Sequence, residues 1–149
     1  DLLKLVVLNR YAPSQPAIGF IRGFGLKTGA IAASIAHDSH NLIACGVSDE
    51  AICRALNLLI ESGGGLAGVS QQEALVLPLP IAGLMSPSEA ATVGRDYAAL
   101  NAYAKKLGSK LNAPFMTLSF MALPVIPELK LTDKGLFDVT SFEFVPLFV

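Results

Sequence analysis

Short apolar runs, each bounded by glycine, proline or polar residues, recur along the first third of the chain. This pattern is typical of buried β-strands. A loop is expected over residues 9–16, where two prolines interrupt the pattern. Lys27-Thr28-Gly29 is expected to turn the chain, so that the second and third strands pair as a hairpin. The pattern predicts four strands, over residues 2–8, 17–26, 29–36 and 41–47.

The polar residues after the fourth strand predict the start of a helix. Ser48 is a good N-cap, because its side-chain oxygen can accept a hydrogen bond from a free backbone N–H. Asp49 and Glu50 suit the positive end of the helix dipole, and the glycines at 63–65 are expected to end the helix. The apolar residues between them form one stripe that would face a sheet: Ile52, Leu56, Leu59 and Ile60.

A second and longer helix is predicted in the later half of the chain. Ser86 and Glu89 have the spacing of a capping box, and Pro87 would occupy the tolerated first helical position. Gly108 is the expected end. The apolar stripe of this helix comprises Val93, Tyr97, Leu100, Ala104 and Leu107.

The remaining segments are predicted as strands. Residues 65–70 and 73–77 have the pattern of a hairpin. Residues 114–124 alternate between an apolar and a mixed face, which predicts a core strand with Thr117 and Ser119 projecting together towards a ligand or a neighbouring strand. Two short strands and loops are expected after it.

These elements predict one α+β domain over residues 1–149. We expect a mostly antiparallel sheet built from hairpins and covered by helices on one side. The length fits a single domain, and the sequence contains no internal repeat and no linker that would divide it.

The composition predicts an uncovered apolar surface. Hydrophobic residues make up 52% of the chain and charged residues only 15%, against about 25% in a typical soluble domain. A membrane-spanning helix does not explain this, because the longest stretch without charge, residues 111–127, contains three prolines. We therefore expect a surface that stays paired with another domain or subunit.

Charge and cysteine usage restrict the class of function. The net charge of −1 and the absence of a basic run exclude the electrostatic pattern of nucleic-acid binding. The chain begins at Asp1 with a strand-like run and without a signal-peptide pattern, from which we expect a fragment of a cytoplasmic protein. Cys45 and Cys53 lack the C-x-x-C spacing of a metal or redox motif, and both are expected to be buried thiols.

The glycine-rich segment over residues 23–29 does not match a phosphate-binding loop. A Walker loop needs glycine directly before Lys27-Thr28, where this chain has Leu26. The dinucleotide-binding pattern G-x-G-x-x-G is also missed by one residue, and a strand instead of a helix is expected after it. A glycine-rich hairpin is the favoured interpretation.

Polar chemistry concentrates in His37-Asp38-Ser39-His40-Asn41, which follows the third predicted strand and holds both histidines of the chain. His37 and His40, at i and i+3, could bind one metal with Asp38 as a third ligand, but the chain offers no further histidine or suitable cysteine. Ser39 beside His40 could form a nucleophile pair, although sequence neighbours seldom reach triad geometry. A hydrogen-bonded structural corner and a ligand-facing or interface loop are the other interpretations.

Several long segments resemble the C-terminal region of bacterial adenine deaminases, and the resemblance covers nearly the whole chain. The segments are GFIRGFGLKTGAIAASIAHDSHN, ESGGGL, LPLPIAGLMS, PFMTLSFMALPVIPELKLTDKGL and FEFVPLF. The resemblance implies a parent hydrolase of the amidohydrolase superfamily. In such enzymes a metal-bound water attacks C6 of adenine, and hypoxanthine and ammonia are formed in purine salvage.

The resemblance also implies that this chain is only the accessory part of that enzyme. It contains no His-x-His strand and no further metal-binding histidines, so the catalytic barrel and its divalent metal, such as Mn, Fe or Zn, are expected outside it. The chain alone should be inactive and without a cofactor. Its expected partners are the barrel of the same polypeptide and further copies in a homo-oligomer.

No catalytic or metal-binding residue is assigned within the chain. The candidates for the substrate pocket or for the interface with the barrel are His37, Asp38, Ser39, His40 and Asn41. An alternative function of a different class is a stand-alone small-ligand or metal-binding module that uses these residues directly.

Overall fold

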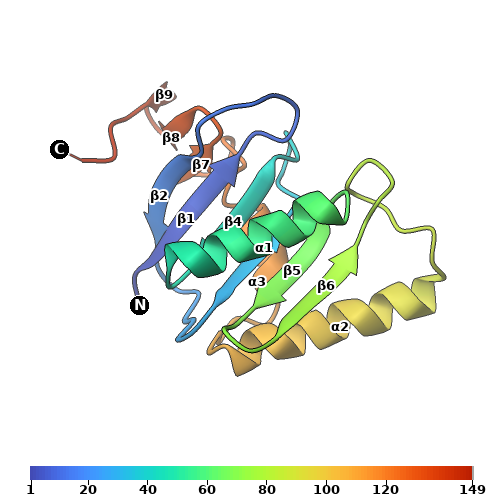
Figure 1. Ribbon diagram of the computed structural model, residues 1–149. Coiled ribbons are helices and arrows are strands. Elements are labelled where there is room, and N and C mark those ends of the chain that lie inside the picture. The colour runs from blue at the N-terminus through green and yellow to red at the C-terminus, as the bar shows by residue number, and fades with distance from the viewer. Residues whose placement is uncertain (149) are drawn as a thin grey trace.

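The computed structural model describes residues 1–148, and its centre is a six-stranded antiparallel sheet (Figure 1). The strand order across the sheet is β2-β1-β4-β3-β5-β6, and each neighbouring pair is antiparallel. The predicted α+β class and the mostly antiparallel sheet are confirmed. The strands are β1 (Leu3–Leu8), β2 (Ala17–Ile21), β3 (Ala30–Ala33), β4 (Leu42–Gly46), β5 (Gly65–Val69) and β6 (Ala74–Pro78).

Helices cover both faces of this sheet (Figure 1). The helix α1 (Asp49–Glu61) packs on β3, β4 and β5 on one face, whereas α2 (Ala90–Lys106) and α3 (Pro114–Ser119) pack on the other. The prediction of helices on one side only is therefore wrong. The alternation along β3 shows the reason, because Ala30 and Ala32 face the α1 core while Ile31 and Ala33 face the opposite core, and all of them are fully buried.

The strand β2 lies at an edge of the six-stranded sheet because it pairs with β1 and not with β3. The predicted hairpin between residues 17–26 and 29–36 is therefore wrong. Instead β3 pairs with β4 and β5 in the interior of the sheet, where all of its residues are buried. Ile18 and Phe20 on β2 are exposed, which suits an edge position.

The helix α1 begins as predicted. Ser48 Oγ accepts a hydrogen bond from the N–H of Ala51 at 3.3 Å, and the glycines at 63–65 follow the helix C-terminus. Ile60, which was expected to face the sheet, is exposed. The buried stripe consists of Ile52, Ala55, Leu56 and Leu59.

The helix α2 begins later than its capping-box prediction. Glu89 is the N-cap residue and its side chain makes no cap hydrogen bond, so the first helical residue is Ala90. Ser86 Oγ instead accepts a hydrogen bond from the N–H of Ser88 in the turn before the helix. Gly108 follows the C-terminus in a left-handed conformation, as expected for a helix stop.

The segment predicted as a core strand over residues 114–124 contains the short helix α3. Pro114 occupies the first turn, where a missing N–H costs nothing. The hydroxyl of Thr117 donates to the carbonyl of Ala113 (3.0 Å), and the hydroxyl of Ser119 donates to the carbonyl of Met116 (2.7 Å). Both hydroxyls therefore bind their own segment instead of a ligand or a neighbouring strand.

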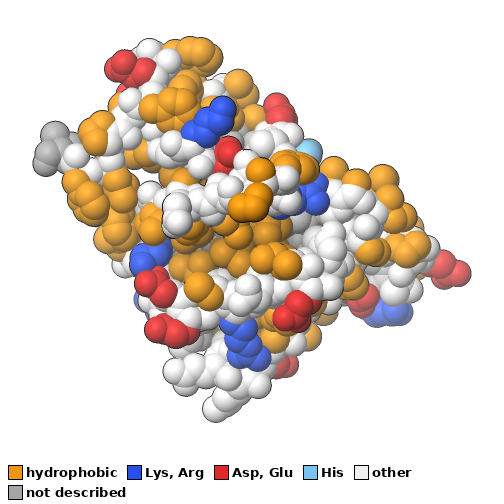
Figure 2. Space-filling view, turned by 45° about the horizontal axis from the view of Figure 1, so that its top comes forward, with side chains coloured by type: hydrophobic (Ala, Val, Ile, Leu, Met, Phe, Trp, Pro, Cys, Tyr) orange, Lys and Arg blue, Asp and Glu red, His pale blue; other side chains and the backbone are white. Residues whose placement is uncertain are grey.

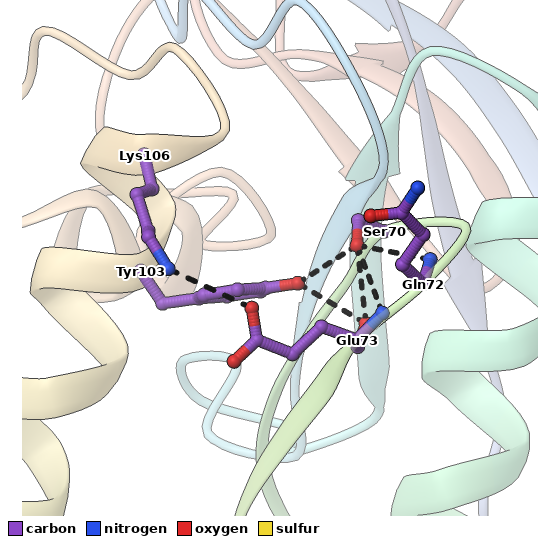
Figure 3. Close-up of polar contacts among 5 residues, drawn as sticks. All are labelled: Ser70, Gln72, Glu73, Tyr103 and Lys106. Atoms are coloured by element: carbon purple, nitrogen blue, oxygen red, sulfur yellow. Dashed lines mark hydrogen bonds and ion pairs between the residues drawn. The ribbon is translucent and has the colours of Figure 1, made fainter.

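Tyr103 of α2 fastens this helix to the β5–β6 hairpin, as Figure 3 shows. Its hydroxyl lies 3.1 Å from both Ser70 Oγ and the carbonyl oxygen of Glu73. Lys106 Nζ lies 3.7 Å from a carboxylate oxygen of Glu73. The buried Tyr103 ring covers Gly68, where an added Cβ would lie only 2.9 Å from the ring. Glycine at this position therefore lets α2 approach the sheet.

A smaller sheet of β7 (Leu129–Thr132), β8 (Gly135–Asp138) and β9 (Glu143–Phe144) packs beside β2. It has one strand more than the sequence predicted. Around this sheet lie strongly exposed apolar side chains, Val125, Phe142 and Phe148, with 65%, 73% and 77% of their surfaces accessible. Within residues 1–148, no helix combines the length and the apolar character needed to cross a membrane.

The two cysteines occupy different environments. Cys45 on β4 is buried, as predicted, and burial raises the pKa of its thiol. Cys53 is exposed on the outer side of α1, so the prediction of two buried thiols is wrong for this residue. Its neighbour Ile52 takes the inward position on the helix.

Candidate functional site

Residues 37–41, here named the histidine loop, connect β3 to β4 at one end of the sheet. Because neighbouring strands are antiparallel, β1 and β3 end here while β4 and β5 begin here. The dark-blue loop after β1 arches over the same end (Figure 1). The topology therefore gathers segments that are far apart in the sequence.

The two histidines are half-buried and lie close to one another. The ring centres of His37 and His40 are 5.6 Å apart, and the ring of His37 lies 4.9 Å from that of Phe120. The N–H of His37 donates to the carbonyl of Ser119 (3.0 Å), and the N–H of His40 donates to the carbonyl of Ala36 (2.7 Å). The histidine loop is thus a closed turn that packs against the end of α3.

Arg10, just after β1, binds the histidine loop to a second turn. Its Nε donates to the carbonyl of His40 (2.6 Å), and its Nη2 donates to the carbonyl of Ala82 (2.7 Å). No carboxylate within residues 1–148 lies at ion-pair distance from this guanidinium. An added Cβ on Gly83, beside Ala82, would overlap Arg10 Nη1, so a side chain at this position would displace the guanidinium.

Tyr11 and Asn41 strengthen the same connection. The hydroxyl of Tyr11 donates to the carbonyl of Ser39 (2.8 Å), and its ring lies 4.9 Å from the guanidinium carbon of Arg10. Asn41 is buried, and its Oδ1 accepts a hydrogen bond from the backbone N–H of Arg10 (3.3 Å). Asn41 therefore orients the backbone of the corner and does not face outward.

Ser34 anchors the turn of residues 79–85 to the sheet. Its side chain is fully buried, donates to the carbonyl of Gly83 (2.5 Å) and accepts a hydrogen bond from the N–H of Gly65 (2.7 Å). The backbones of Gly64 and Gly83 approach so closely that an added Cβ on Gly64 would overlap Gly83. The turn that binds Arg10 is therefore attached to the sheet through Ser34.

The environment of His40 favours its neutral form. Burial of the imidazole lowers its pKa below the ordinary 6.5, His37 and Arg10 lower it further, and Asp38 acts in the opposite direction. The Nδ1 atom of His40 is buried without a hydrogen-bond partner. A neutral imidazole of this kind can accept or relay a proton at neutral pH.

The histidine loop alone does not assemble a metal centre or a catalytic triad. In residues 1–148, no three His, Cys, Asp or Glu side chains are grouped closely enough to hold a metal ion. Asp38 and Ser39 are exposed, and within the same residues no hydrogen bond joins Ser39 to either histidine. The described residues therefore group no third His, Cys, Asp or Glu ligand with His37 and His40.

A hollow of about 510 Å³ lies beside Arg10 and Tyr11 on the α1 face of the sheet. It is lined by the loop after β1, including Arg10 and Tyr11, and by apolar side chains. On this side of the molecule apolar side chains gather in a central depression (Figure 2). The apolar lining residues include Leu8, Leu42, Leu59 and Ile60.

Sequence reasoning found the histidine loop but missed the residues that hold it. Arg10 and Tyr11 lie in a segment predicted only as a loop, and Gly83 lies in a segment that carried no chemical prediction. The one available indication was a basic residue placed directly after a buried strand, where binding groups commonly lie.

Comparison with known proteins gives the family. Residues 1–143 match the model of the adenine deaminase C-terminal domain. The chain is 58% identical over 148 residues to adenine deaminase of Methanosarcina acetivorans, 56% over 146 residues to that of a Sulfurovum species, and 50% over 147 residues to that of Borreliella burgdorferi. These alignments cover 99%, 97% and 97% of this chain but only 27% of each relative.

The chain therefore spans about a quarter of the length of the relatives that it matches. The resemblance noted in its sequence is confirmed along nearly its whole length. The chain belongs to the adenine deaminase C-terminal domain family.

Proposed function

We propose that this chain is the accessory C-terminal domain of a longer adenine deaminase, whose remaining part contains the catalytic barrel. The full enzyme would hydrolyse adenine to hypoxanthine and ammonia in purine salvage, using a metal-activated water. The relatives named adenine deaminase support this proposal, because they match this chain from end to end and extend far beyond it. The domain alone would be inactive.

Within that enzyme, the histidine loop faces the catalytic domain and either completes the substrate pocket or closes the interface. One observation carries this part of the proposal: His37 and His40 lie together, with ring centres 5.6 Å apart, and both residues are only half-buried at the end of the sheet. Imidazoles that remain partly accessible at a loop can contact a group on the neighbouring domain or on the substrate. Asp38 and Ser39 would contact the same neighbour from the exposed side of the loop.

The barrel of the same polypeptide is the first partner in this proposal, and further copies in a homo-oligomer are the second. The exposed apolar side chains Val125, Phe142 and Phe148 support a paired surface. Adenine would be bound by the full enzyme, the divalent metal would be held by the barrel, and the location would be cytoplasmic. The alternative of a stand-alone ligand or metal module is not supported, because the relatives are adenine deaminases and the described residues group no three metal ligands.

The test is adenine deamination by the full-length enzyme carrying His37→Ala or His40→Ala. If the loop contributes to proton transfer or to substrate orientation, kcat should fall about 100-fold, while metal content and thermal stability stay near those of the parent. Asn57→Ala, on the exposed side of α1, is the control and should leave the rate unchanged.

Two results would contradict the proposal. Normal rates in both histidine variants would remove the loop from the active site. Deaminase activity in the isolated 149-residue chain would show that the domain is not merely accessory.

A further inference from the structure

We infer that Arg10 is the positioning residue of this corner: its guanidinium fixes the histidine loop against the Ala82–Gly83 turn and so sets the orientation in which His37 and His40 meet the catalytic domain. The inference deepens the proposed function and rests on it for its catalytic consequence. Its structural part, the fixing of the loop by Arg10, can be tested without any activity.

The contacts of Arg10 join segments that are otherwise separate. The carbonyl of His40 lies 30 residues further along the chain, and that of Ala82 lies 72 residues further. A guanidinium is planar and presents its donors in a rigid fork, so binding two acceptors at once fixes the distance and angle between them. Tyr11 holds the adjoining carbonyl of Ser39, so two successive carbonyls of the loop are bound from the same short segment.

The turn on the other side of Arg10 is itself immobilised. Gly83 leaves space for the guanidinium, and the buried hydroxyl of Ser34 binds the carbonyl of Gly83 from the sheet side. Arg10 therefore connects the histidine loop to a fixed part of the sheet end. A loop bound only to solvent-exposed groups would not be held in a fixed position relative to the sheet.

The charge of Arg10 is not used in an ion pair within residues 1–148, and its known partners there are carbonyl and hydroxyl oxygens. Hydrogen bonds from a charged donor are about twice as strong as neutral ones, which makes the guanidinium an effective clamp. Its charge also acts on His40, together with His37 and Asp38. Geometry and charge can be separated, because lysine retains the charge but not the fork.

The experiment compares Arg10→Gln, Arg10→Lys and Gly83→Ala in the full-length enzyme. Two quantities are measured: hydrogen exchange of the backbone over residues 37–41, and kcat and KM for adenine. Arg22→Gln is the matched arginine control, because Arg22 is exposed and its side chain makes no hydrogen bond or ion pair within residues 1–148. Gly23→Ala is the matched glycine control, because Gly23 has a positive φ (+90°) as Gly83 does (+73°), and an added Cβ at Gly23 meets nothing within 4 Å.

We expect exchange of the loop to rise about tenfold or more in all three variants, since each removes or displaces the fork. We expect kcat to fall 10- to 100-fold, by analogy with the cost of about 1 Å of misplacement, with KM nearly unchanged. Arg10→Gln should also raise the pKa of His40, seen as a shift of its NMR titration, whereas Arg10→Lys should not. The two controls should match the parent in exchange and in kcat.

A coupled variant guards against simple misfolding. If Gly83→Ala acts by displacing the guanidinium, it should lower kcat much less in an Arg10→Ala background than in the parent. Equal losses in both backgrounds would overturn the inference. Unchanged loop exchange in Arg10→Gln would also overturn it.

Failure of this inference can be told apart from failure of the proposed function. If the histidine variants lose activity while the Arg10 and Gly83 variants keep it, the loop acts in catalysis but Arg10 does not position it. If the histidine variants are fully active, the proposed role of the loop fails, and with it the catalytic role of Arg10.

Discussion

The hydroxyl of Tyr103 offers a sharp test of how α2 is held on the sheet. In Tyr103→Phe the buried ring remains and only the contacts with Ser70 and Glu73 are lost. Both partners keep other bonds, because the carbonyl of Glu73 accepts from the N–H of Ser70 (2.8 Å) and Ser70 Oγ accepts from the N–H groups of Gln72 and Glu73. No buried group is left unpaired, so the expected cost is about 1 kcal/mol.

That free energy converts to a measurable change in melting temperature. The unfolding entropy of a 149-residue chain is roughly 0.3 kcal/mol/K, so Tyr103→Phe should lower Tm by about 3 °C. Tyr97→Phe is the matched control, because Tyr97 is half-buried on the same helix and its hydroxyl has no hydrogen-bond partner within residues 1–148. The Tm values of both variants and of the parent are measured by calorimetry. Equal Tm values for the two variants would refute the view that the Tyr103 hydroxyl fastens α2.

Three further predictions address other parts of the structure. A thiol reagent should label only Cys53 in the folded chain, and Cys45 only after unfolding; labelling of both at equal rates would contradict its burial. Ser48→Ala should destabilise the chain by about 1 kcal/mol in urea titrations, and no change would show that the cap is unimportant. The pKa of His40 is lower in the folded chain than in the unfolded chain. As the pH falls, the imidazole is therefore protonated first in the unfolded chain. Stability should then fall as the pH drops from about 7.5 to 5.5, and His40→Gln should reduce this dependence.

The elements predicted correctly from the sequence are those that depend on nearby residues. The start of α1 follows from the Ser48 cap, and three of the four residues in its predicted stripe are buried. The β5–β6 hairpin joins strands that are close in sequence, and its predicted pairing is confirmed. In both cases the interacting groups are a few residues apart, so local chemistry is sufficient.

Strand pairing across the sheet could not be predicted in the same way. The sequence around residues 17–36 favours a local hairpin. In the structure β3 does not pair with β2 and lies between β4 and β5. What decides the position of β3 is the burial of all its residues, which requires a layer on each face. Those layers are α1 and the α2–α3 pair, and α2 and α3 lie far along the chain.

The segment after Pro114 shows a different limit. Its alternation of apolar and polar residues is typical of a strand, but its first six residues form α3, where the hydroxyls of Thr117 and Ser119 donate to nearby backbone carbonyls. A short apolar run does not distinguish a strand from a buried helix. Proline at the start, tolerated in a first helical turn, was the better indicator here.

The candidate site shows why a cluster in the sequence and a site in the fold are different things. The histidine loop was visible because five polar residues are consecutive, whereas Arg10 and the Ala82–Gly83 turn reach it only through the antiparallel topology. The first loop also contacts the small sheet, since Asn9 donates to a carboxylate oxygen of Asp133 at 2.9 Å. This hydrogen bond therefore links the loop that carries Arg10 to the turn between β7 and β8. Under the proposed function, a catalytic domain that binds the apolar surface would have the histidine loop held at a fixed place beside it.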